Sequence, residues 1–373
     1  MSYKIKTSDL LKSLQQTIKV VPTRSTLPIL SCALFDFSET LKISATNLET
    51  SINTSLNIEN IDKQNNTIAI PVGRFFEIIS NIKDETIELI VQEEKKIKIR
   101  TINGTFSITG QDYKEFPSDP VMNESTSLSL NIKDFLEIIN FTKASVSRDE
   151  LKPALQGVLL KINTNQIIGV STDGHRLSRI IIEGKNDQTK EHEIIVPIKF
   201  LTLLNSFIDN KNKIELEISE NYISISHNNQ TIFSRIIKDT YPDYEKVIPL
   251  DNNKILKINK LELIEAIKRV SIFSNKSTKQ IALKIEQTKT TIQTEDIENA
   301  AKGKETIVSE FNNQEELKIG FNAHFILEAL SNIKQENIKV FLNTPLSAAI
   351  IAEKEEKTSK DKLLLLMPIR LND

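Results

Sequence analysis

One helical pattern occurs three times in this sequence at an almost constant spacing. In residues 197–207, PIKFLTLLNSF, apolar side chains follow the spacing i, i+3, i+4 and i+7, which places them on one face of a helix. Similar segments lie in residues 71–83 and 323–334, with 125 positions between the first and second copies and 126 between the second and third. We therefore predict three helices, each with a buried face. The apolar positions are Phe75, Ile78, Ile79 and Ile82; Phe200, Leu203, Leu204 and Phe207; and Ile326, Ala329, Leu330 and Ile333.

A second helical segment keeps the same period. Its copies begin at Asp9, Asp134 and Glu262, which are 125 and 128 positions apart. In the last two copies an Asn precedes the acidic residue by three positions, at Asn131 and Asn259. An Asn side chain caps a helix N-terminus well, and an acid in the first turn interacts favourably with the helix dipole. Each repeat therefore contains two predicted helices.

Runs with the alternation and β-branched content of strands lie between the helices. A repeat of about 125 residues is longer than the roughly 20–50 residues of a solenoid unit, so each repeat is interpreted as a domain. The predicted fold class is α+β, with three similar domains at residues 1–122, 127–250 and 254–373, each with two helices packed on antiparallel β-sheets. The predicted strands include Ala33–Phe37, Leu41–Ala45, Thr86–Val91, Val158–Ile162, Gln166–Ser171, Lys213–Ile218, Ile281–Ile285, Thr290–Thr294 and Asn337–Leu342.

The links between the predicted domains contain matching proline motifs. Phe116–Pro117 lies in EFPSDP, and Tyr241–Pro242 lies 125 positions later in TYPDYEKVIP. Proline fixes its own φ and favours an extended conformation for the residue before it. We therefore predict stiff connectors that hold neighbouring domains at a fixed spacing.

Composition limits the class of protein. Cys32 is the single cysteine, so no internal disulfide is possible, and the four histidines are scattered without metal-ligand spacing. The N-terminus is too polar for a signal peptide, and no apolar run approaches the roughly 20 residues of a membrane helix. We expect a soluble, cytoplasmic protein with no cofactor, no bound metal and no membrane partner.

The net charge of −2 is unusual for a protein that binds DNA through its phosphates, because such proteins are generally basic. The six predicted helices nevertheless carry 12 Lys or Arg against 8 Asp or Glu. Either these are ordinary solvated helix charges, or one surface is positive where the helices lie and the rest is negative. The helix ranges counted are 9–20, 74–83, 133–148, 199–209, 260–270 and 324–334.

The most informative motif is VSTDGHRLS at residues 170–178. Asp173–Gly174 after a strand-like run predicts a hairpin turn that brings Thr172, His175 and Arg176 together. A catalytic triad is a spatial arrangement, and Asp-Gly-His within one turn does not place the carboxylate behind the imidazole. A hairpin with a satisfied polar cluster is the simpler interpretation. A catalytic role predicts that His175→Ala abolishes activity, whereas a binding role predicts only weaker binding.

Several motifs together resemble the bacterial sliding clamp, the β subunit of DNA polymerase III. They are RSTLPIL at 24–30, TNLETSI at 46–52, LKPALQG at 151–157, STDGHRL at 171–177, YPDYEKV at 241–247 and LLLLMPIRL at 363–371, and the resemblance covers essentially the whole chain. It implies the DNA clamp fold, with two chains joined head to tail in a closed ring around duplex DNA. The implied function is to tether the replicative polymerase and other clients for processive DNA synthesis, without catalysis.

The resemblance also implies three sets of site residues. Arg24, Arg148 and Lys152 would face DNA, although Asp149 and Glu150 make the second of these loops partly acidic. Arg74, Phe106, Ile272, Phe273 and Glu298 would lie at the dimer interface. A pocket for short client peptides would be lined by Leu155, Thr172, Gly174, His175, Arg176, Leu177, Pro242, Lys246, Val247, Leu365, Met367, Pro368, Ile369 and Arg370.

The partners that the resemblance implies are double-stranded DNA, held without reading its sequence, and a second copy of the chain. Further partners are the DNA polymerase III catalytic subunit, an ATP-driven clamp loader complex, and other polymerases and repair proteins that bind through short peptide motifs. Two alternatives remain. One is an enzyme that uses Asp173 and His175, and the other is a non-catalytic scaffold of three repeats that does not bind DNA. The charged stretch Glu353–Lys362 is predicted to be an exposed loop before the last strand.

Overall fold

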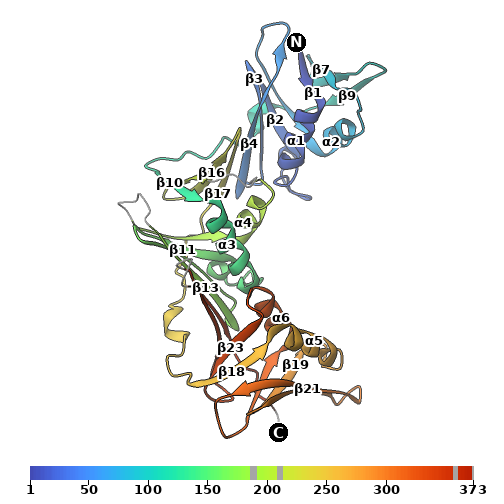
Figure 1. The fold of residues 1–373 in the computed structure, drawn as a ribbon. Helices are drawn as coiled ribbons and strands as arrows, with labels where there is room; N and C mark the ends of the chain where they lie inside the picture. Colours follow the sequence, from blue (N-terminus) through green and yellow to red (C-terminus); the bar gives the residue numbers. More distant parts are fainter. Residues whose placement is uncertain (185–190, 208–212, 356–359, 372–373) are drawn as a thin grey trace. The chain divides into compact units, whose positions relative to one another are not determined.

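The computed structural model describes residues 1–184, 191–207, 213–355 and 360–371, and all its strand pairs are antiparallel. The chain packs into two compact units. One unit comprises Met1–Lys133 with Lys199–Ile236, and the other comprises Asp134–Ile198 with Ile237–Asp373. The second sequence repeat is therefore divided between the two units (Figure 1).

The first unit contains two β-sheets among its described residues. One has five strands in the order β5 (Glu59–Asn60), β1 (Ser2–Lys6), β7 (Thr86–Gln92), β8 (Lys96–Arg100) and β9 (Thr105–Thr109). The other has eight strands in the order β10 (Thr126–Asn131), β15 (Lys213–Ile218), β16 (Tyr222–His227), β17 (Gln230–Arg235), β4 (Thr50–Asn57), β3 (Thr40–Thr46), β2 (Cys32–Phe37) and β6 (Asn66–Pro71).

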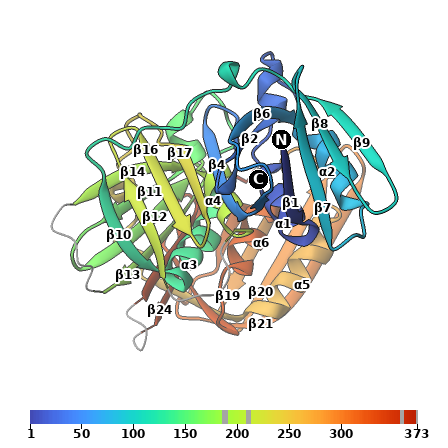
Figure 2. The same ribbon diagram turned by 90° about the horizontal axis from the view of Figure 1, so that it is seen from above.

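Two helices of the first unit pack against each other and against both sheets. Helix α1 (Thr7–Thr17) contacts β1, β3 and β4, and helix α2 (Val72–Ser80) contacts β2 and β6. The aromatic ring of Phe75 meets that of Phe35 edge to face, with centroids 5.2 Å apart. Figure 2 shows α2 beside the strands of the five-stranded sheet.

The second unit is built on one twelve-stranded sheet, counted over the described residues. Helices α5 (Lys260–Ser271) and α6 (Ala323–Ser331) pack side by side against it, as Figure 1 shows. The strand order is β14 (His192–Pro197), β11 (Gly157–Ile162), β12 (Gln166–Thr172), β13 (Arg176–Glu183), β25 (Lys360–Leu366), β24 (Ala349–Glu355), β23 (Asn337–Leu342), β18 (Lys254–Asn259), β21 (Ala301–Phe311), β20 (Lys289–Asp296), β19 (Gln280–Glu286) and β22 (Leu317–Asn322).

All six predicted helices are confirmed, the remaining two being α3 (Ile132–Thr142) and α4 (Ile198–Leu204). The predicted cap at Asn259 is also present, because its side chain accepts a hydrogen bond from the Glu262 amide at 3.1 Å. Helix α4 departs from the predicted face in one respect. Leu201 is fully buried while Leu203 is only half-buried, and the helix ends at Leu204, so that Phe207 lies in the turn that follows.

In each repeat, the segment that follows the domain forms a backbone hydrogen bond with an edge strand of a β-sheet, and the three bonds are equivalent. The amide of Gln111 donates to Ala69 at 2.8 Å, that of Ile237 donates to Ile195 at 2.9 Å, and that of Ile369 donates to Gly320 at 2.8 Å. In the first two repeats this segment leads into the proline connector, and Phe116 then packs on a buried apolar cluster. In the last repeat the C-terminal segment takes the same position.

The prediction that Glu353–Lys362 is an exposed loop is wrong for the two ends of this segment, which belong to strands β24 and β25. Residues 356–359 lie outside the described part. Glu353 and Lys362 are opposite one another on strands β24 and β25, and they are only 2% and 1% exposed. Helix α3 supplies the partner, since the Glu137 carboxylate lies 2.8 Å from the Lys362 amine. Burial of both charges is possible because opposite charges face each other in the low-dielectric interior.

Candidate functional site

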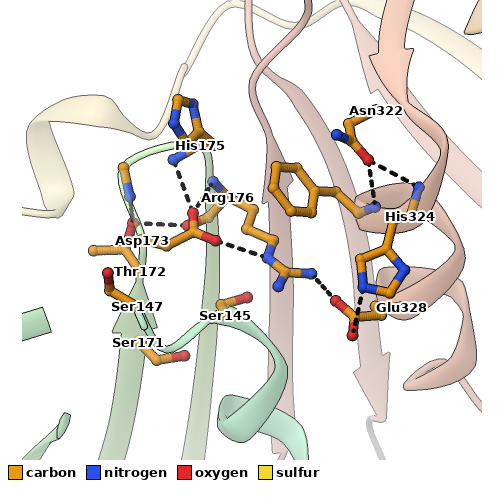
Figure 3. Close-up of polar contacts among 12 residues, drawn as sticks. Ser145, Ser147, Ser171, Thr172, Asp173, His175, Arg176, Asn322, His324 and Glu328 are labelled. Carbon is orange, nitrogen blue, oxygen red and sulfur yellow. Dashed lines mark hydrogen bonds and ion pairs between the residues drawn. The ribbon is translucent and has the colours of Figure 1, made fainter. Parts of the chain in front are cut away.

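The hairpin turn between β12 and β13 forms the centre of the site (Figure 3). One Asp173 carboxylate oxygen accepts hydrogen bonds from the amides of His175 and Arg176 at 2.9 and 3.0 Å. The Thr172 hydroxyl accepts from the Gly174 amide at 3.1 Å and donates to the Arg176 carbonyl at 2.7 Å. Gly174 has a φ of +89°, which glycine adopts without steric cost. The predicted tight turn is confirmed.

The Arg176 guanidinium ties this turn to helix α6. Its Nε donates to Asp173 at 3.0 Å, its Nη1 binds the Glu328 carboxylate, and its plane lies over the Phe325 ring at 4.4 Å. The other oxygen of Glu328 lies 3.3 Å from the His324 imidazole. Arg176 is therefore a fixed, largely buried part of the site rather than a free cation.

This geometry provides no support for a triad at Asp173 and His175. The Asp173 carboxylate accepts from the backbone of His175 and from the Arg176 side chain, so it does not hold the imidazole in place. The His175 ring lies stacked near Phe325, with centroids 6.3 Å apart. Among the described residues, no cluster of His, Cys, Asp and Glu has a metal-binding arrangement.

The C-terminal segment forms one side of the site. Strand β25 pairs with β13, which places Leu365 opposite Leu177. Beyond the strand, the Met367 amide donates to the His175 carbonyl at 2.8 Å. Met367 is 42% exposed and Arg370 is also exposed, whereas Pro368 and Ile369 are half-buried.

An apolar cluster forms the floor beneath the turn. Leu177 and Leu365 are buried in it, together with Val170 and Tyr244, while Tyr241 packs at its margin. Burial raises the pKa of Tyr241 and raises the pKa of Tyr244 to about 12, so both phenols are neutral at physiological pH.

The connector forms another side of the site. Pro242, Lys246 and Val247 lie in it or in its short helix Glu245–Val247, and all three are exposed. A hydrogen bond from Lys246 to Asp243 at 2.8 Å raises the pKa of the lysine. Leu155 is buried in the neighbouring short helix Pro153–Gln156.

The turn of the site has a close copy in the first repeat. The amides of Glu49 and Thr50 donate to Asn47 at 3.0 and 2.7 Å, and the Thr46 hydroxyl accepts from the Leu48 amide at 3.0 Å. The Arg235 amide donates to the Glu49 carbonyl at 2.9 Å, as Met367 does to His175. The main difference is that Leu48, with a φ of +73°, takes the place of Gly174.

Replacing Leu48 with Gly is expected to stabilise the first unit by about 0.5–1 kcal/mol. A left-handed conformation costs a leucine roughly 1–2 kcal/mol, and the greater freedom of glycine in the unfolded chain offsets about half of this. Urea denaturation followed by circular dichroism measures the change. Gly174→Ala is the matched control and should destabilise by about 1 kcal/mol. A loss of stability in Leu48→Gly would mean that the side-chain contacts outweigh the backbone strain.

The predicted DNA-facing residues are exposed. Arg24 and Arg148 have no ion pair among the described residues, whereas Lys152 lies 3.9 Å from Asp149.

On the helices, acidic side chains form ion pairs with basic residues more often than basic side chains form them with acidic residues. Glu137 and Glu328 bind cations on strands, and Glu265 pairs with Arg269. Helix lysines and arginines without an acidic partner in the described part include Lys12, Arg74, Lys133, Lys199, Lys260 and Lys268.

Three of the predicted interface residues lie at or beside two sheet edges, whereas Arg74 is on helix α2 and Glu298 is in the turn between β20 and β21. In the first unit, Phe106 is 42% exposed on β9, which pairs with β8 alone among the described strands. In the second unit, residues 301–308 of β21 pair with β20 on one side, and β21 contacts β18 only from residue 309 onwards. Phe273 packs beside Gly303 of this strand, and its neighbour Ile272 is 77% exposed.

Comparison with known proteins assigns the family. Residues 1–120, 129–243 and 245–370 match the N-terminal, central and C-terminal domains of the DNA polymerase III beta subunit. The chain belongs to this sliding clamp family. It is 26% identical to the beta sliding clamp of Haemophilus influenzae over the full length of both chains.

Solved clamp structures have the same fold as this clamp. The DNA polymerase III beta subunit of Pseudomonas aeruginosa superposes with a TM-score of 0.93 at 25% identity, with both chains fully covered. A sliding clamp of the same organism bound to griselimycin gives a TM-score of 0.91 at 25% identity, also with both chains fully covered. Within the described part of the clamp, no helix is long and apolar enough to cross a bilayer.

Three residues that hold the site together were not predicted from the sequence. Phe325, Glu328 and His324 all lie on α6, about 150 positions after the turn. Phe325 and Glu328 contact Arg176, and His324 lies beside Glu328. Their sequence segment indicated only an amphipathic helix. The repeat pattern gave no signal for Glu328, since the equivalent residues are Thr202 in the second repeat and Glu77 in the first.

Proposed function

We propose that this protein is a homodimeric, ring-shaped sliding clamp that encircles duplex DNA and tethers the replicative polymerase and other clients. The observation that carries the proposal is a threefold repeat with an unpaired sheet edge in each unit, at β9 and at β21, counted over the described residues. An exposed strand edge favours pairing with another chain. Head-to-tail pairing of two chains closes a ring when the rotation is right.

Exposed apolar residues support the pairing of these edges. Phe106 on β9 and Ile272 and Phe273 beside β21 would be buried together at each interface. Arg74 and Glu298 would add an ion pair at its margin. Six repeats would then complete the ring, each contributing about a sixth of a turn.

The helix charges support DNA as the partner in the ring. Helix lysines and arginines without acidic partners would meet phosphates, and Arg24, Arg148 and Lys152 would add contacts from loops. Such contacts position a protein on DNA without reading its sequence. A ring that holds DNA topologically needs only weak attraction, which is consistent with a net charge of −2.

The site around the β12–β13 turn would bind short apolar peptides from clients. The copy of this turn in the first repeat lacks an apolar floor, and Asp119 pairs there with Lys42 at 2.6 Å. Burying apolar side chains against hydroxyls and charges gains little, so clients should select the second turn. The first-repeat counterparts of Ile168, Val170 and Leu177 are Lys42, Ser44 and Ser51.

The proposed clients are the DNA polymerase III catalytic subunit, other polymerases and repair proteins. A separate clamp loader complex, driven by ATP, would open the ring. We assign no catalytic activity to the clamp itself and place it with its DNA in the cytoplasm.

The test is retention on DNA. The purified protein is loaded by a compatible clamp loader and ATP onto a nicked circle, washed at high salt, and followed after the circle is cut. We expect the protein to survive the wash and to be lost when the DNA is linearised, because salt screens contacts but not topology.

Two other results would count against the ring. Equal retention on circular and linear DNA would indicate ordinary contact binding. If the protein is retained on neither circular nor linear DNA, the loader must be shown to load a different clamp under the same conditions. With that control, the result would favour a scaffold that does not hold DNA.

A further inference from the structure

Helix α6 contributes one carboxylate, that of Glu328, to the proposed peptide site around the β12–β13 turn. One of its oxygens accepts a hydrogen bond from Nη1 of Arg176, and the other lies 3.3 Å from Nε2 of His324. The side chains of Arg176 and Glu328 are 10% and 31% exposed. Because water screens this pair only in part, its attraction is stronger than that of an ion pair on the open surface.

Glu328 fixes the Arg176 side chain from outside the turn. Another carboxylate on this guanidinium belongs to Asp173, which lies three positions earlier in the same turn and accepts a hydrogen bond from Nε at 3.0 Å. A contact within one turn does not determine how that turn lies against another element. Glu328 follows Arg176 by 152 positions and binds the far end of the guanidinium, as Figure 3 shows.

The ion pair places the guanidinium on an aromatic ring. The guanidinium carbon of Arg176 lies 4.4 Å from the ring centroid of Phe325, which precedes Glu328 by three positions on α6. Residues three positions apart lie on the same face of a helix. A cation over an aromatic face is attracted by the ring, and more strongly where water is partly excluded. Phe325 and Glu328 therefore hold Arg176 together.

We propose that Glu328 is a positioning residue that determines the charge preference of the peptide site. The proposal rests on the proposed function and deepens its account of client binding. Glu328 holds the Arg176 guanidinium on the Phe325 ring and, together with Asp173, neutralises its charge. A carboxylate on a client would have to displace Glu328 to bind this guanidinium, so the site favours uncharged apolar peptides over acidic ones.

The first experiment tests the positioning role without a client. The chain contains no Trp, so Phe325→Trp places a single fluorescent indole under the Arg176 guanidinium. Quenching of this indole by acrylamide is measured in Phe325→Trp and in Phe325→Trp/Glu328→Gln. We expect stronger quenching in the second protein, because the guanidinium no longer covers the ring. An unchanged quenching constant would show that Arg176 stays on the ring without Glu328, and it would overturn the positioning role.

The second experiment measures the charge preference. A phage-displayed library of short random peptides is selected against the wild type, and the preferred uncharged peptide is also synthesised with each position in turn replaced by Asp. Calorimetry gives the dissociation constants for the wild type, Glu328→Gln and the control Glu88→Gln. Glu88 lies 2.7 Å from Arg100 in the first unit and its side chain is 21% exposed, so the control removes the same charge from a similar pair outside the site. Thermal denaturation checks that the variants fold.

We expect Glu328→Gln to improve the affinity of at least one Asp-containing peptide, relative to the uncharged peptide, by about 10-fold, because the released guanidinium can bind its carboxylate. The control should keep the wild-type ratio of affinities. Adding Arg176→Gln to Glu328→Gln should remove the gain, since the guanidinium is its source. Equal weakening of uncharged and Asp-containing peptides by Glu328→Gln would indicate a purely structural role and would overturn the proposal.

Failure of this proposal is distinguishable from failure of the proposed function. A wild type that selects no peptide would count against the client site itself, whereas the quenching experiment needs no client and still decides whether Glu328 positions Arg176. Wild-type retention on circular DNA is independent of both experiments.

Discussion

Replacing Lys362 with Met is expected to lower the Tm of the clamp by about 10 °C. The Lys362 amine lies 2.8 Å from Glu137 and 3.5 Å from Glu353, and Lys362 and Glu353 are almost fully buried. Removing one partner of a buried pair leaves an uncompensated charge, which costs about 3–5 kcal/mol. At roughly 2–4 °C per kcal/mol for a unit of this size, a loss near 10 °C follows. Differential scanning calorimetry measures it.

Two control variants separate burial from charge. Lys362→Met/Glu353→Leu removes both partners and should recover much of the lost stability, since an apolar pair can replace a buried ion pair. Lys257→Met removes an exposed lysine that lies 3.1 Å from Glu310, and it should change stability by at most about 1 kcal/mol. Equal effects of Lys362→Met and Lys257→Met would show that the buried pair is not important for stability.

The effect of Lys362→Met should also depend on pH. Burial alone would raise the pKa of Glu137, but hydrogen bonds and charge from Lys360 and Lys362 outweigh it and lower the pKa from 4.5 to about 2. The ion pair therefore stabilises the folded state fully above about pH 4.5, and this contribution is lost as the pH falls towards 2. The difference in Tm between wild type and Lys362→Met should shrink over that range.

The second large effect is expected at the sheet edges. Phe106→Ser combined with Ile272→Ser should weaken the dimer by a factor of at least 100, because each change removes an apolar side chain of the proposed interface centre, worth about 2 kcal/mol. Sedimentation equilibrium measures the dissociation constant. The same variant should also be lost from circular DNA.

Val121→Ser is the matched control for the interface. Val121 is 70% exposed in the connector and belongs to neither edge strand, so its replacement should leave the dimer intact. Dimerisation of the Phe106→Ser/Ile272→Ser variant at wild-type strength would rule out these edges as the interface. The Tm of the variant shows whether each unit remains folded.

The repeat pattern predicted the secondary structure well because local periodicity dominates it. Strands β15 and β23 have the predicted bounds, and all six helices are present. The wrong prediction concerned Glu353 and Lys362. Their charge indicated an exposed loop, but each has an opposite charge across the strand pair and a further carboxylate at Glu137, which lies 225 positions before Lys362.

The candidate site was predicted in part. The Asp173–Gly174 turn was predicted from local turn chemistry, and the proximity of Leu177, Leu365 and Met367 rested on the family resemblance. The role of α6 was not predicted, because contact between Arg176 and Glu328 depends on how two distant segments pack. Pairing of side chains far apart in a chain leaves no periodic signal in either segment.

The sequence by itself determined the threefold repeat, the helices and strands of each repeat, and the tight turn at residues 172–176. These features depend on periodicity, capping and turn preferences, which act over a few residues. Only the tertiary structure decided which charges are buried, which helix acids are neutralised, and which of the two similar turns has an apolar floor. Those outcomes depend on burial and on distances between remote residues, because the energy of a charge is set by its surroundings rather than by its neighbours in the chain.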